Sequence, residues 1–134
     1  MYTSRIAAAV FIVALTAGPL QAAETPPIPM LSGGIGEAEV VRMTAAEKEY
    51  NLKLIFADEA GAYLAEVSVI IRDNKKEVIV NAQSQGPIVL ITLKPGVYEL
   101  TSTSMRGITK NETITVGERD LTTHYVHLHT TIKP

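Results

Sequence analysis

From Tyr50 onward, apolar side chains recur at every second residue, which is the period of a β-strand with one buried face. Polar turn residues interrupt this alternation about every ten to twelve residues, a spacing typical of a sandwich of antiparallel sheets. We therefore predict an all-β domain over residues 50–130. Its seven short strands are marked by these apolar residues: Leu52, Leu54 and Phe56; Val67, Val69 and Ile71; Val78 and Val80; Ile88 to Leu93; Tyr98 and Leu100; Ile114 and Val116; Leu121, Val126 and Leu128.

The most specific turn signal in this domain is the stretch Leu93–Tyr98. Pro95 presets the φ angle for the second position of a tight turn, and Gly96 suits the third position. Alternating runs of β-branched and other apolar residues flank this stretch on both sides. The pattern predicts a β-hairpin formed by the two flanking strands.

Residues 1–22 have the organisation of a secretory signal peptide. Arg5 provides a positive start, and Ile6–Ala17 is an uninterrupted run of small and apolar residues. This run is shorter than the roughly twenty residues that a membrane-spanning helix needs. We expect export and cleavage after Ala22, with Ala23 as the alternative, and no stable membrane anchor afterwards.

The composition restricts what the exported chain can be. It contains no cysteine, so its stability must come from apolar burial and sheet pairing rather than from disulfides. The formal net charge of the full sequence is −2, which argues against a nucleic-acid-binding protein. The length left after cleavage suffices for one domain and is too short for two ordinary ones.

Residues 23–36 are rich in proline, glycine and small residues, as in Thr25–Pro29 and Ser32–Gly34. This composition predicts a flexible or extended leader between the signal peptide and the folded domain.

A helical pattern follows the leader over residues 37–49. Val40 and Met43 lie three residues apart, and acidic residues are concentrated at the start of the segment. The pattern predicts a short amphipathic helix that covers one edge or face of the sheet. Thr44 with Glu47 has the spacing of a capping box and could instead start a second, shorter turn.

Several stretches of the chain resemble the small secreted carboxypeptidase regulatory-like proteins of Gram-negative bacteria. They are Ser32–Glu37, Tyr50–Leu54, Gly61–Ala65, Gly86–Pro87 and Leu93–Tyr98. The resemblance covers roughly residues 32–128, and each motif is a turn or core feature. One departure is Lys94, which stands where a second proline is common in the family.

The resemblance implies a seven-stranded antiparallel sandwich of the transthyretin-like or immunoglobulin-like type, located in the periplasm. It implies no peptidase activity, because the peptidase domain and its zinc ligands are absent from this sequence. We expect a non-catalytic module that binds a periplasmic or envelope protein, or another envelope component, through its loops or an exposed sheet edge.

The three histidines of the sequence lie together in the last predicted strand. Because side chains alternate along a strand, His127 and His129 share one face with Tyr125, whereas His124 points with Val126 and Leu128 toward the core. Two imidazoles then converge, fewer than the three or four donors of zinc and copper sites. The simpler interpretation is two solvated histidines on an edge strand. The alternative to a binding module is a periplasmic metal-binding protein that uses His127 and His129.

No motif in the sequence combines a nucleophile, a base and an orienting group, or pairs two catalytic carboxylates. Transthyretin-related hydrolases end in Tyr-Arg-Gly-Ser, whereas this chain ends in Thr131–Pro134. The sequence therefore predicts neither an enzyme nor a bound cofactor, and it assigns no catalytic or metal-ligating residue.

Overall fold

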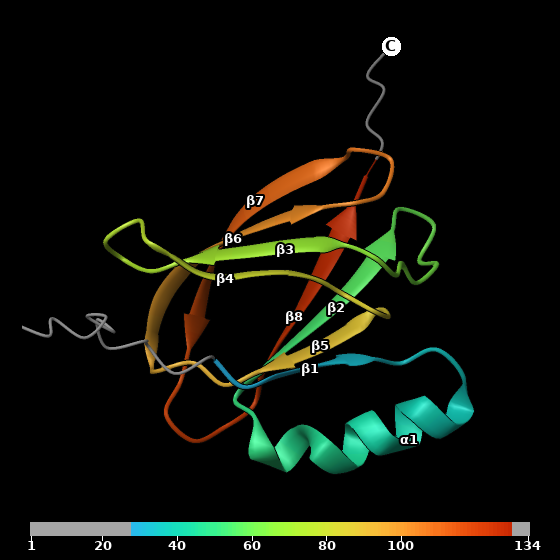
Figure 1. Ribbon diagram of the computed structural model, residues 1–134, viewed down its shortest axis with the longest axis horizontal. Coiled ribbons are helices and arrows are strands. Elements are labelled where there is room, and N and C mark those ends of the chain that lie inside the picture. Colours follow the sequence, from blue (N-terminus) through green and yellow to red (C-terminus); the bar gives the residue numbers. More distant parts are fainter. Residues whose placement is uncertain (1–27, 130–134) are drawn as a thin grey trace, which may run out of the picture.

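A computed structural model describes residues 28–129 as two four-stranded sheets packed face to face (Figure 1). The first sheet has the order β1 (Met30–Gly33), β5 (Ile88–Ile91), β2 (Leu52–Asp58), β8 (Thr122–Leu128). The second has the order β4 (Val78–Gln83), β3 (Ser68–Arg72), β6 (Gly96–Thr103), β7 (Thr109–Val116). The predicted all-β sandwich is confirmed. The predicted signal peptide, residues 1–22, lies outside the described residues.

Apolar side chains from alternate positions of the two sheets fill the space between them, as the period of two predicts. Phe56 of β2, Ile71 of β3, Leu100 of β6 and Val126 of β8 are completely buried. These residues belong to one contiguous hydrophobic cluster. Because burying side chains of this size stabilises a fold by about 1.5–3 kcal/mol each, this cluster holds the two sheets together without any disulfide.

Residues 28–129 form eight strands, so the prediction of seven is wrong. The additional strand, β1, occupies Met30–Gly33, within the segment predicted to be a flexible leader, residues 23–36. It pairs antiparallel with β5, and without it β5 would be an edge strand. Covering β5 in this way satisfies backbone groups of an otherwise exposed apolar edge.

The helical segment consists of α1 (Glu37–Ala46) followed by the 3₁₀ turn η1 (Glu47–Glu49). The helix packs beside β1 (Figure 1), and its Met43 side chain is buried. The Gly34 N–H, which follows β1, donates to Glu39 Oε1 at 2.9 Å. Lys53 of β2 forms an ion pair with Glu47, so the helical segment is held to the first sheet at both of its ends.

The predicted hairpin around Pro95 and Gly96 is wrong, because the strands on its two sides belong to different sheets. β5 pairs with β1 and β2, whereas β6 pairs with β3 and β7. The Leu93–Tyr98 stretch is therefore a corner at which the chain crosses from one sheet to the other. The Tyr98 hydroxyl donates to the Lys94 carbonyl at 2.5 Å, which is the arrangement of a tyrosine corner.

The expectation of a purely antiparallel sandwich is also wrong at one pair, because β2 and β8 run parallel (Figure 1). After β7 the chain crosses back to the first sheet and enters it beside the start of β2. There the Thr122 N–H donates to the Asn51 carbonyl at 2.9 Å. Entry at the same end of the sheet as the start of β2 makes the two strands run in the same direction.

Candidate functional site

The outer edge of β8 is the first feature that could bind another molecule. In a parallel pair, the backbone N–H and C=O groups of alternate residues point to the neighbouring strand. Because Thr122 donates to Asn51, the backbone groups of every second residue after it, starting with His124, also face β2. Those of Thr123, Tyr125 and His127 face away from the sheet, and no hydrogen bond joins them to any other part of residues 28–129.

Another element lies beside each edge of the first sheet: α1 beside β1, and β7 of the second sheet beside β8. Neither of these neighbours pairs with the edge strand as a further strand of the first sheet. On the outer face of β8, Thr123, Tyr125 and His127 are all exposed, and Tyr125 keeps 57% of its surface accessible. An edge strand with unpaired outward backbone groups is a template for pairing with another chain.

The side chains of β8 alternate as the sequence predicts. His127 and His129 lie on the exposed face with Tyr125, whereas Val126 and Leu128 are buried. The rings of Tyr125 and His127 have centroids 6.5 Å apart, and those of His127 and His129 are 6.1 Å apart. These three side chains, which we call the β8 ring ladder, run along the outer face of the edge strand.

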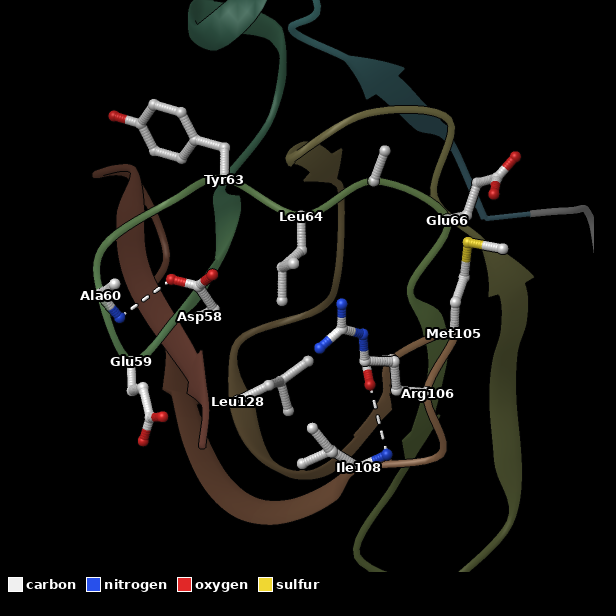
Figure 2. Close-up of a pocket in the computed structure, with 12 residues that line it drawn as sticks. Asp58, Glu59, Ala60, Tyr63, Leu64, Glu66, Met105, Arg106, Ile108 and Leu128 are labelled. Atoms are coloured by element: carbon white, nitrogen blue, oxygen red, sulfur yellow. Dashed lines mark hydrogen bonds between the residues drawn. The ribbon is translucent and has the colours of Figure 1, made fainter. Parts of the chain in front are cut away.

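A pocket of about 500 Å³ lies at the end of the sandwich where β8 terminates (Figure 2). Its apolar floor comes from Leu64 in the segment after β2, Ile108 in the β6–β7 connection, and Leu128 at the end of β8. Tyr63 and Met105, which are 71% and 72% exposed, stand at its rim. Large exposed apolar side chains around a concave surface are typical of interaction sites.

Charged residues surround this end pocket unevenly. Asp58, Glu59 and Glu66 provide carboxylates, and Arg106 provides the positive charge (Figure 2). Asp58 Oδ1 accepts hydrogen bonds from two backbone N–H groups of the loop that follows β2, each at 2.9 Å. That carboxylate therefore shapes the loop, and the excess of acidic residues makes the pocket favourable to a basic ligand.

The half-buried His124 has a partner that the sequence analysis missed. Its Nε2 lies 2.7 Å from Oε2 of Glu112 on β7, and this hydrogen bond connects the two sheets on their inner side. Lys110 Nζ lies 3.9 Å from the same carboxylate oxygen. The other oxygen, Glu112 Oε1, is buried and has no hydrogen-bond partner among the described residues.

A histidine beside a carboxylate raises the question of a catalytic triad. Ser102 of β6 points to the same interior, but it is completely buried, and its hydroxyl has no hydrogen-bond partner among residues 28–129. A nucleophilic serine must contact its base and be reachable by substrate. Ser102 meets neither condition, so Ser102, Glu112 and His124 do not form a triad.

The end pocket could not be identified from sequence patterns because it is assembled from three separate segments. The sequence did contain a weak sign of the Glu112 contact. Glu112 is a charged residue on the inward side of β7, the side that it shares with Lys110 and the buried Ile114. A charge at an inward position needs a partner, but only the packing of the two sheets reveals that this partner is His124.

The comparisons with known proteins provide no family for this chain. No family model matches it, and no curated protein is similar enough to count as a relative.

Within residues 28–129, no helix is both long and apolar enough to cross a membrane. The fold itself defines the class: an all-β sandwich of two four-stranded sheets within residues 28–129, with β1 and β8 as the edge strands of the first sheet.

Proposed function

We propose that this chain is a non-catalytic periplasmic module of the carboxypeptidase regulatory-like, transthyretin-like type. It binds an extended segment of another envelope protein along β8. One observation carries the proposal: the outward backbone groups of Thr123, Tyr125 and His127 have no partner within residues 28–129, and this edge leads to the end pocket through Leu128. Main-chain pairing at an open edge provides affinity, and side-chain pockets provide specificity.

The end pocket restricts the chemistry of the segment that would bind. Its floor of Leu64, Ile108 and Leu128 suits an apolar side chain. The three carboxylates around one arginine favour a neighbouring basic residue. The partner segment is therefore an extended strand in which an apolar residue and a basic residue lie at the end that reaches the pocket.

The environments of Ser102 and Asp58 support a non-catalytic role. The buried Ser102 lacks contact with a base, and the Asp58 carboxylate is engaged by loop amides. The periplasmic location rests on the signal peptide predicted at residues 1–22.

Site-specific photocrosslinking in the periplasm tests the binding mode. A photoreactive amino acid at Tyr125 samples the β8 edge, and the same residue at Val97 provides a matched control. Val97 lies on β6 of the other sheet and is 53% exposed, against 57% for Tyr125. We expect a dominant crosslinked protein from position 125 only, with the crosslink mapped by mass spectrometry to an extended segment that contains apolar and basic residues.

Two outcomes would contradict this function. Equal crosslinking from both positions would indicate contact without a specific edge. The absence of any specific product at position 125, with the variant protein folded and exported, would remove strand addition at β8 as the binding mode.

A further inference from the structure

The β8 ring ladder presents two imidazoles side by side on an exposed surface. His127 and His129 are two residues apart on one strand, their ring planes differ by 19°, and their centroids are 6.1 Å apart. The His129 side chain keeps 48% of its surface accessible. Neither ring is involved in the core, so both can reorient toward a common ligand without disturbing the sheet.

The surroundings of His129 favour a cation. Glu59 Oε2, from the loop after β2, lies 3.9 Å from His129 Nδ1. At this distance Glu59 contributes its negative charge and not a hydrogen bond. The negative charge beside this end of the ladder also lowers the cost of binding a divalent ion.

We propose that His127 and His129 chelate one divalent copper ion on the outer face of β8. Imidazole nitrogen suits Cu²⁺, and Cu²⁺ binds a given set of nitrogen donors more tightly than the other first-row divalent metals. No group of three or more histidine, cysteine, aspartate or glutamate residues among the described residues could hold a metal ion. Water therefore completes the coordination, and the site is open and exchangeable rather than structural.

The ligands of this site differ from the groups proposed to pair with the peptide, and the two sites share Glu59, which lies beside His129 and lines the end pocket. The copper site uses side chains on the outer face of β8, whereas the partner segment would use the backbone groups at the edge of the same strand. Copper binding can therefore be tested on the purified protein alone, and its failure would leave the crosslinking prediction unaffected.

Calorimetric titration of the untagged protein with Cu²⁺ tests the site, with one equivalent expected to bind. Each of the variants His127→Asn and His129→Asn removes one of the two imidazoles that bind the same ion. Because the chelate is lost, each variant should bind Cu²⁺ about tenfold to a hundredfold more weakly. The matched control is His124→Asn on the same strand. His124 faces inward and contacts Glu112, so this variant should keep the affinity of the original protein.

A second measurement needs no variant that could misfold. Substoichiometric Cu²⁺ should broaden the ring proton resonances of His127 and His129 in the unmodified protein and leave those of His124 sharper. Binding weaker than about 1 mM would overturn the proposal. So would unchanged affinity in the double variant His127→Asn/His129→Asn, or selective broadening of His124.

Discussion

At the scale of single residues, the two buried serines of this domain differ in whether the hydroxyl has a partner. Ser84 Oγ accepts a hydrogen bond from the Val67 N–H at 2.9 Å, whereas Ser102 Oγ is buried and has no partner among the described residues. Leaving a buried donor unpaired costs about 1–3 kcal/mol, and removing an unpaired hydroxyl does not. The same substitution should therefore have different effects at these two positions.

We expect Ser84→Ala to lower the free energy of unfolding by about 1–3 kcal/mol, because it leaves the Val67 N–H without an acceptor. Ser102→Ala should change it by less than about 0.5 kcal/mol or increase it. Urea denaturation of the two variants measures both values. Equal destabilisation by the two substitutions would contradict this assignment of the buried hydroxyls.

Tyr98 links the corner between the sheets to the stability of the protein in alkaline solution. Burial, and secondarily the negative charge of Asp73, raise the pKa of Tyr98 above its ordinary value of 10.0. The native state therefore keeps a proton that the unfolded chain loses at lower pH. The stability contributed by this group is complete below about pH 10 and is lost as the pH rises from there through the raised native pKa.

We expect Tyr98→Phe to cost about 0.5–1.5 kcal/mol at neutral pH, because the hydrogen bond to the Lys94 carbonyl is lost. The phenylalanine variant has no ionisable group at this position, so the difference between it and the original protein should shrink above about pH 10. Urea denaturation of both proteins at several pH values measures this difference. A difference that stays constant into alkaline solution would show that Tyr98 ionises equally in both states.

At the scale of secondary-structure elements, β1 depends on a close approach between two glycines. A Cβ atom at Gly86, just before β5, would lie 2.3 Å from the carbonyl oxygen of Gly33 at the end of β1. The atom in the way belongs to the backbone, so β1 itself would have to move. Gly117, in the turn after β7, offers a control because a Cβ there meets nothing within 4 Å.

Gly86→Ala should therefore destabilise the protein by about 1–3 kcal/mol, the usual cost of overpacking. Gly117→Ala should stay within about 0.5 kcal/mol of the original protein. Urea denaturation compares the two variants. If Gly86→Ala is as stable as Gly117→Ala, the pairing of β1 with β5 described above is wrong.

The same elements show which parts of the fold the sequence could predict. The period of two located the strands from residue 50 onward and most of their inward residues, because alternation is a local property of each strand. It fails at Val78, which is 50% exposed beside a register shift between β3 and β4. It could not assign partners, so the strands beside Pro95 and Gly96 were expected to pair although the chain crosses there between sheets. Strand β1 was missed because its four residues lie within a segment rich in proline and glycine, and its stability comes from β5.

In the candidate site, too, the features set by one strand were predictable and the contacts between separate segments were not. The shared face of His127 and His129 was predictable, because it depends only on alternation along β8. The contact between Glu112 and His124 was not, because it depends on how closely the two sheets pack. The end pocket was also not predictable, since Leu64, Ile108 and Leu128 come together only when three separate segments meet.

At the scale of the whole molecule, the order of the strands decides where another chain could add. In the first sheet, β1 and β8 are the edge strands. β1 is flanked by α1, whereas the outward backbone groups of β8 lack partners within residues 28–129. The first sheet therefore ends in two edge strands, with α1 beside β1 and β7 beside β8, and strand addition is proposed at β8 because its outward backbone groups are unpaired.

Amide hydrogen exchange along β8, measured residue by residue in the free monomeric protein, tests this central claim most directly. Amides that point to β2, such as those of His124 and Val126, should exchange slowly because they are hydrogen-bonded. Those of Tyr125 and His127 should exchange much faster because they face the open edge. Equally slow exchange at all four amides would mean that the β8 edge is already occupied, and it would contradict the proposed mode of binding.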